Sequence, residues 1–542
     1  MFPFQLTGLK EILGAVQTKP FSLSNISRFP DDEFSSNQGK YSDYWDWFQG
    51  TPLLEVQMQG DQAVSKFPIK INPLKAAVIK HAYALFGEFR EDSRPLVYPQ
   101  FKPNNLNPED KKAAIVAQNW INTIWWENSG RSLMMRNALL AQIMGGCIFR
   151  LSYVPREMAR GIRSIPLKVD CPHPTNFIGI PIQGDEYRLS EAWLIQAITY
   201  KDAQASGISI DEGAQIYYVE HYTPDIMEFS INGMPIPTGE FDLTTGNPIY
   251  YGGTNPFGFV PIVYIPHIRV SGFYGESHVT ESVKGIIMEM NARMADLGDA
   301  SSDDSHRYYF MANTNGIPSV IDLAPGVRVI NGGTNPSITG KESSPMLEQI
   351  GQQRMTEPML NFIKTLDLAF RREVSVPAVA DGEDEGSQRS SLTLAMRMWP
   401  LISHTRTERV YWGDALNVLT RMMVNMIITK GMIEGFPVQA QSMRIEQKWA
   451  SMLPRDREML INELVNRSSA KLGSEEHLLE LTEDVEDPID EMEKIKEWTK
   501  ELATIEAEAQ AKANPAPPTP MGVAPSSAQQ KSNLSTKKKV SQ

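Results

Sequence analysis

Two stretches in the middle of the chain carry apolar residues at helical spacing. In the first, the apolar positions recur three or four residues apart, at Val279, Val283, Ile286, Ile287, Met290, Met294 and Leu297. This period gives a helix one apolar face. Ser277 is a typical N-cap residue. The pattern therefore predicts a long amphipathic helix that starts at Ser277 and frays in the polar run 299–304.

A second helix is expected after Ser344-Pro345, because serine caps helices and proline suits the first helical position. Its apolar positions are Leu347, Ile350, Met359, Phe362, Ile363, Leu366 and Phe370. Pro358 is expected to kink this helix, and Val376-Pro377 to end it. The segment between the two helices, 308–341, contains a strand-like run, Val327–Ile330, and is too small to bury a core of its own.

A third helix is expected from Ser390 or Ser391 to Gly431, with a bend at Pro400. Its inward positions are Leu392, Ala395, Met396, Trp399, Val410, Leu416, Leu419, Met423 and Ile427. A short acidic loop precedes this helix, made of Asp381, Gly382, Glu383, Asp384, Glu385, Gly386, Ser387, Gln388 and Arg389.

The flanking regions divide by their periodicity. Helices are expected over 71–86, 108–126 and 132–144. From 148 to 270 the period is two, with strands at 195–200, 216–219 and 261–266 and a hairpin turn at Asn232-Gly233. Helices are also expected over 455–465 and from Asp487-Pro488, the latter with an inner face of Ile489, Met492, Ile495, Trp498, Leu502 and Ile505. The aromatic run 41–48 lacks the basic neighbours of a base-stacking platform, which favours core or subunit packing.

Composition limits the classes of function. A chain of 542 residues with a formal net charge of -13 argues against DNA binding through a basic face, but it is compatible with a protein past which DNA slides. Two cysteines, Cys147 and Cys171, provide no disulfide framework. Neither a signal peptide nor a membrane span is evident, so we expect synthesis in the cytoplasm and no membrane partner.

We find no motif for catalysis, a metal or a cofactor. Gly333–Lys341 has the wrong spacing for a phosphate loop, and Glu342 stands where a hydroxyl residue is needed. Cys171-Pro-His173 has no second cysteine or histidine pair nearby, and the eight histidines are scattered. The acidic run Asp381–Glu385 does not match a calcium loop and reads as a surface loop. No catalytic residue, metal ligand or cofactor is therefore expected.

From residue 63 to 510, the order of parts resembles the portal protein of tailed double-stranded DNA bacteriophages, also called the head-tail connector. A proline-flanked strand, Pro261–Pro266, and the turn Tyr274-Gly275-Glu276-Ser277 lead into the first long helix, as in that family. The resemblance implies an α+β ring subunit with a mixed α/β wing, two stem helices, a small α/β clip and a helical crown.

The resemblance also implies boundaries for these parts. They are an N-terminal arm and outer wing (1–62), the wing (63–276), stem helix 1 (277–306), the clip (307–345), stem helix 2 (346–376), a tunnel loop (377–391), a long kinked helix with the wing return (392–454), crown helices (455–512) and a disordered tail (513–542).

In function, the resemblance implies a dodecameric ring without catalytic activity at one vertex of the capsid. Double-stranded DNA would be packaged and ejected through this ring, which would contact the large terminase subunit, the major capsid and scaffolding proteins, and the tail adaptor. The virion would be its final location. A metal-dependent nucleic-acid-processing enzyme, supported only by Asp303-Asp304, and another head-tail structural protein are the alternatives.

Site residues follow from the same resemblance. The acidic loop Asp381–Arg389 corresponds to the tunnel loop, in which Gly382 and Gly386 would allow flexing. Weak phosphate contacts are expected from Lys284, Arg293, Arg328 and Arg389, although surface or ion-pair roles fit each of them as well. Since a lone helix pair cannot cover its apolar stripe, neighbouring copies in a closed ring are expected to cover Val283, Ile286, Ile287, Met290, Phe362, Ile363 and Leu366.

Overall fold

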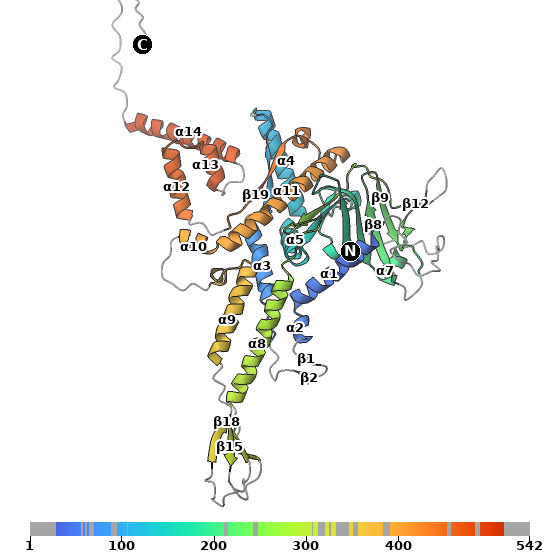
Figure 1. Ribbon diagram of the computed structural model, residues 1–542. Helices are drawn as coiled ribbons and strands as arrows, with labels where there is room; N and C mark the ends of the chain where they lie inside the picture. Colours follow the sequence, from blue (N-terminus) through green and yellow to red (C-terminus); the bar gives the residue numbers. More distant parts are fainter. Residues whose placement is uncertain are drawn as a thin grey trace, which may run out of the picture. The chain divides into compact units, whose positions relative to one another are not determined.

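The chain forms two compact units, Met1–Pro454 and Arg455–Gln542 (Figure 1). The computed structural model describes residues 29–55, 58–59, 62–63, 70–87, 95–105, 107–210, 215–241, 248–305, 307–312, 320–324, 327–331, 346–350, 356–382, 391–452, 457–482 and 488–513. The tail expected to be disordered lies almost entirely outside the described residues.

The first unit combines helices with several small sheets, which confirms the α+β class. Its helices are α1 (Asp31–Gln49), α2 (Pro52–Glu55), α3 (Pro73–Phe86), α4 (Pro108–Glu127), α5 (Gly130–Met144), α6 (Pro155–Ala159), α7 (Tyr200–Ala205), α8 (Glu281–Ser305), α9 (Thr356–Glu373), α10 (Ser391–Arg397) and α11 (Trp399–Lys430), with 3-10 turns η2 (Pro174–Asn176), η3 (Ala378–Asp381) and η4 (Val438–Gln441).

The strands pair mostly with antiparallel neighbours. They are β1 (Met58–Gln59), β2 (Gln62–Ala63), β3 (Val97–Lys102), β4 (Gly146–Tyr153), β5 (Leu167–Asp170), β6 (Phe177–Pro181), β7 (Leu189–Ala197), β8 (Tyr217–Tyr222), β9 (Ile226–Ile231), β10 (Met234–Pro235), β11 (Pro237–Phe241), β12 (Pro248–Tyr250), β13 (Gly252–Thr254), β14 (Ile262–Pro266), β15 (Arg307–Ala312), β16 (Val320–Ala324), β17 (Val327–Asn331), β18 (Met346–Ile350) and β19 (Arg444–Trp449).

The largest sheet runs in the order β10-β9-β8-β7-β6, with β13 paired to β9. Asn232 and Gly233 both have positive φ, 49° and 76°, and they form the predicted tight hairpin turn between β9 and β10. A second sheet, β14-β4-β5, places the predicted strand of 261–266 next to β4. All five residues of β14 are buried, so this strand belongs to the core of the first unit.

The main core forms around α11. Leu416, Leu419, Met423 and Ile427 are buried as predicted, together with side chains of α3, α4, α5, β4 and β14. Gly431 ends α11 in a left-handed conformation. The predicted bend near Pro400 is confirmed as a break between α10 and α11 at Met398. The inward assignment is wrong for Met396, Trp399 and Val410, whose side chains are exposed.

A four-stranded sheet lies between α8 and α9 in the chain and has the order β16-β17-β15-β18. β17 confirms the predicted strand at Val327–Ile330. The prediction that the second helix starts at Met346 is wrong, because Met346–Ile350 forms the strand β18, which pairs with β15. The backbone groups of this short segment are satisfied by strand pairing, which overrides local helix signals. α9 begins at Thr356, so Pro358 lies in its first turn and kinks nothing.

The second unit contains α12 (Arg457–Ser469), α13 (Glu475–Thr482) and α14 (Pro488–Ala513). The inner face expected on α14 is not buried, since Ile495, Trp498, Leu502 and Ile505 are all exposed. Within the described residues of the whole chain, no helix has the length and apolar character needed to cross a membrane.

Gly145, the residue that ends α5, provides a test of this packing. It has φ of 80°, and a Cβ there would lie 2.4 Å from the carbonyl oxygen of Gly275, before α8. We expect Gly145→Ala to lower the free energy of unfolding by about 2–4 kcal/mol through backbone strain and overlap. Gly161→Ala is the matched control, because its φ is 71° and its Cβ meets open space. Equal melting temperatures for the two variants would contradict this account.

Candidate functional site

The helix α8 is anchored within its own subunit. Thr280, rather than the expected Ser277, is its cap, because the Thr280 hydroxyl accepts a hydrogen bond from the Val283 amide at 3.3 Å. Ser277 instead donates to the Ile143 carbonyl at the end of α5. Farther along, the buried Asn291 side chain exchanges hydrogen bonds of 2.7 and 2.8 Å with the backbone of Ile71, before α3.

The apolar face of α8 is covered by the same chain. Val283, Ile287 and Met290 are 2%, 0% and 5% exposed, and Ile286 is partly buried. They share one core with residues of α1, α3, α5 and α9, namely Tyr41, Trp47, Phe48, Leu74, Val78, Ile143, Met144 and Phe370. The expectation that neighbouring copies cover Val283, Ile287 and Met290 is therefore wrong. The aromatic run of α1 has the core role that was favoured for it.

α9 lies beside α8 (Figure 1) and presents a different surface. Phe362 is 44% exposed, and Leu360 and Leu368 are exposed as well. Leu366 is partly buried against the α8 core, and Ile363 is half-buried. Of the residues assigned to subunit packing, Phe362 is thus the one that a single chain leaves most accessible.

Two of the expected phosphate contacts have partners within the chain. Lys284 is only 8% exposed, and its Nζ lies 2.5 Å from Asp43 and 2.6 Å from Glu281. A lysine buried in this way is not available to a phosphate in a channel, so that assignment is wrong. Arg293 pairs with Glu289 and Asp296 on its own helix. Arg328 belongs to β17 and its side chain is not described; Arg389 lies outside the described residues.

The start of the acidic loop is part of the fold. Asp381 ends η3 and forms ion pairs with Lys80 of α3 and Arg371 of α9, the latter at 2.7 Å. Gly382 follows with φ of 77°. Glu383, Asp384, Glu385, Gly386, Ser387, Gln388 and Arg389 lie outside the described residues. Asp381 is therefore a structural ion-pair residue that connects two helices.

A second apolar surface is exposed after the acidic loop. Leu394 and Met396 of α10 and Trp399 of α11 are 39%, 67% and 54% exposed. The guanidinium group of Arg406 lies over the Trp399 ring, 5.4 Å from its centre. Large apolar side chains exposed close together in the chain are candidates for contact with another molecule.

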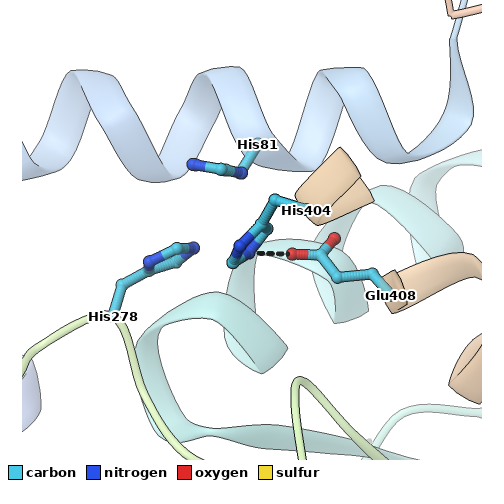
Figure 2. A group of neighbouring side chains, drawn as sticks. All are labelled: His81, His278, His404 and Glu408. Carbon is cyan, nitrogen blue, oxygen red and sulfur yellow. Dashed lines mark ion pairs between the residues drawn. The ribbon is translucent and has the colours of Figure 1, made fainter. Parts of the chain in front are cut away.

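A buried polar cluster joins the elements around the start of α8. The imidazoles of His81 from α3, His278 from the segment before α8 and His404 from α11 gather beside the carboxylate of Glu408 (Figure 2). One possible ligand atom from each residue lies within 4.8 Å of the others. Of the described residues, these four are the group whose chemistry could hold a metal ion.

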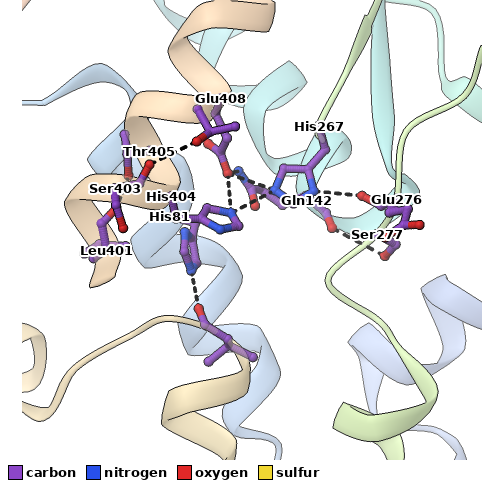
Figure 3. A network of polar contacts seen from close by, with 12 residues as sticks. His81, Gln142, His267, Glu276, Ser277, Leu401, Ser403, His404, Thr405 and Glu408 are labelled. Carbon is purple, nitrogen blue, oxygen red and sulfur yellow. Dashed lines mark hydrogen bonds and ion pairs between the residues drawn. The ribbon is translucent and has the colours of Figure 1, made fainter. Parts of the chain in front are cut away.

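Hydrogen bonds connect the cluster to its surroundings (Figure 3). Glu408 Oε1 lies 2.8 Å from His267 Nε2, 2.9 Å from His404 Nε2 and 3.0 Å from the amide nitrogen of Gln142. His81 Nε2 lies 2.6 Å from the carbonyl oxygen of Val374, directly after α9. The cluster therefore contacts the segments where α8 begins and where α9 ends.

Burial determines the protonation of the cluster. It lowers the pKa of His81 to about 4, and it lowers the pKa of His278 well below the usual range together with the charges of the neighbouring histidines. Burial alone would raise the pKa of Glu408, but hydrogen bonds and charge from His267 and His404 outweigh it and lower this pKa. At neutral pH, His81 and His278 are thus neutral and Glu408 is ionised.

The sequence contained one local signal for this cluster. His404 and Glu408 are four residues apart on the same face of α11, between the buried Ile402 and Trp412. His81, His267 and His278 come from other parts of the chain, so these histidines are scattered in the sequence and only the fold brings them to His404 and Glu408. Cys171 and His173 form no such group: Cys171 is buried, and His173 pairs with Thr175.

The role of Asp381 can be tested by a double-mutant cycle with Lys80. The side chains of Lys80 and Asp381 are each less than a third exposed. We therefore expect a coupling energy of about 0.5–1 kcal/mol between Asp381→Asn and Lys80→Met. Chemical unfolding of the four proteins measures it. Strictly additive effects would mean that Asp381 is solvated and belongs to the loop alone.

Comparison with known protein families gives a match for part of this chain. Residues 252–504, slightly less than half of the chain, match the family model described as "Phage portal protein, SPP1 Gp6-like". The match starts at β13 and ends within α14, so it includes α8, the four-stranded sheet, α9, the acidic loop, α10 and α11. No curated protein matches the chain. Over residues 252–504, this chain is therefore similar to the phage portal protein family.

Proposed function

We propose that copies of this chain form a closed ring, a dodecamer, at one vertex of a phage capsid, and that double-stranded DNA passes through its axis during packaging and ejection. The match to the portal family over 252–504 supports this function. The ring contacts the large terminase subunit during packaging, the major capsid and scaffolding proteins during assembly, and the tail adaptor afterwards. In this proposal the protein acts by assembly rather than by catalysis.

The observation that carries the ring is that one copy leaves large apolar side chains exposed on two different elements. They are Leu360, Phe362 and Leu368 on α9, and Leu394, Met396 and Trp399 around the break between α10 and α11. A cyclic ring larger than a dimer needs heterologous contacts, in which one surface of each copy meets a different surface of the next. We assign these two surfaces to that contact, in place of the α8 residues that the subunit buries itself.

Weak interaction with DNA fits the charge distribution. Tight DNA binding needs many cations facing phosphates. Lys284 and Arg293 are paired within the chain, and the acidic loop Asp381–Arg389 has more acidic than basic residues. In our proposal the loop repels the phosphates of passing DNA. This repulsion keeps the binding of DNA weak and lets the duplex move along the axis.

The ring contact can be tested with a variant of α9. We expect Phe362→Asp to abolish the ring while leaving the subunit folded, because this side chain is exposed in one copy and would become a buried unpaired charge in the ring. Lys364→Asp, at another exposed position of α9, is the control; it changes the charge by −2 rather than −1 and should still assemble. Light scattering after gel filtration separates the 60.8 kDa subunit from a dodecamer, and circular dichroism checks folding.

A ring of normal mass from Phe362→Asp would exclude α9 from the subunit contact. If the wild-type chain stayed a monomer under assembly-promoting conditions, the proposed function itself would be contradicted. Degradation of DNA by the purified protein with magnesium would favour the nuclease alternative instead.

The acidic loop can be tested separately from assembly. We expect deletion of Gly382–Gly386 to leave the ring mass unchanged but to reduce packaging or retention of DNA, because the charged residues between the two glycines are lost. Electron microscopy of purified rings and the DNA content of filled heads measure the two effects. Normal head filling by this variant would show that the loop has no role in DNA passage.

A further inference from the structure

We propose that the buried cluster of His81, His278, His404 and Glu408 is a binding site for a divalent transition metal ion, zinc in particular. The four residues come from α3, the segment before α8, and α11. His81 and Glu408 are fully buried and His278 is 8% exposed. The proposal is independent of ring assembly, because all the donors belong to one copy.

The first argument is that several donor atoms have no partner. His81 Nδ1, His278 Nε2 and Glu408 Oε2 are buried and form no hydrogen bond with any described residue. A buried polar atom without a partner costs free energy, so such atoms are rare in folded proteins. Three of them in one cluster indicate that something absent from the protein chain satisfies them.

The second argument indicates that a cation satisfies these buried atoms. His81 Nε2 faces a carbonyl oxygen, so it carries the ring proton and leaves a lone pair on Nδ1. Glu408 Oε2 is the oxygen in the cluster without a partner, and a carboxylate oxygen accepts hydrogen bonds. A cation between a ring-nitrogen lone pair and a carboxylate oxygen satisfies both.

The donor set and its dimensions fit zinc. Imidazole nitrogen with one carboxylate oxygen is a common zinc ligand set, and bonds of about 2.0–2.1 Å place tetrahedral donors roughly 3.3 Å apart. His404 Nε2 lies 2.9 Å from Glu408 Oε1, so this pair is already close to that spacing. One possible ligand atom from each of the four residues lies within 4.8 Å of the others.

Surrounding groups hold the donors in place as outer partners of metal sites do. The Val374 carbonyl fixes the His81 ring, the Glu276 carbonyl fixes the His267 ring, and the Gln142 amide holds Glu408. An ion at this position would link α3 and α11 to the segments where α8 begins and α9 ends. We therefore expect it to stabilise the connection between the two stem helices and the body of the subunit.

The test uses the full-length protein, stripped with a chelator and then loaded with zinc or cobalt. We expect one equivalent of zinc per chain after gel filtration, measured by plasma mass spectrometry. The zinc-loaded protein should have a higher melting temperature than the stripped protein. The cobalt-loaded protein should show the visible absorption bands of a cobalt ion in a low-symmetry ligand environment. Loss of zinc on gel filtration together with an unchanged melting temperature would overturn the proposal and leave a metal-free hydrogen-bonded cluster.

Two variants locate the ion. His278→Ala removes an Nε2 that makes no hydrogen bond, and Glu408→Gln keeps the shape of the side chain while removing its charge. Each should weaken zinc binding by about 10-fold or more. His477→Ala, at an exposed histidine of the second unit, is the control and should bind as the wild type does. Full zinc binding by both cluster variants would overturn the assignment, and the wild-type measurements decide the proposal if either variant fails to fold.

Discussion

Burial of the apolar face of α8 inside its own subunit is the constraint on which the rest of the structure depends. Ile287 is fully buried against α1, α3 and α5, and Asn291 ties the helix to the backbone before α3. A helix that protrudes from a globular body usually needs a neighbour to cover its apolar stripe. Here the body itself covers the first half of α8, so the subunit does not need the ring in order to fold.

Because α8 is covered within its own subunit, contacts between copies must use other elements. Apolar side chains are exposed on α9 and around the break between α10 and α11, on either side of the acidic loop in the chain, and these are the ones we assign to the contact. Because a closed ring requires two different complementary surfaces, this distribution suits assembly better than a single stripe would. The polar cluster of His81 and Glu408 adjoins the segment before α8 and the end of α9, so these two ends are held at one junction.

Much of the fold could be predicted where local chemistry determines local structure. Asn107 caps α4, Asn232-Gly233 forms a tight turn and Gly431 ends α11, as their residue types require. Prediction failed where partners distant in sequence decide the outcome. Met346–Ile350 becomes a strand because β15 pairs with it, and α8 is buried because α1 covers it. The histidine cluster was missed because only His404 and Glu408 are close in the sequence.

The central claim is that each subunit buries α8 itself and uses α9 and the α10–α11 break to contact its neighbours. A cryo-electron microscopy map of the assembled particle tests this most directly. The account predicts that Ile287 packs against α1 and α3 of its own chain, while an adjacent copy covers Phe362, Met396 and Trp399. A ring in which these three side chains remain exposed, or in which a neighbour covers Ile287, would contradict it.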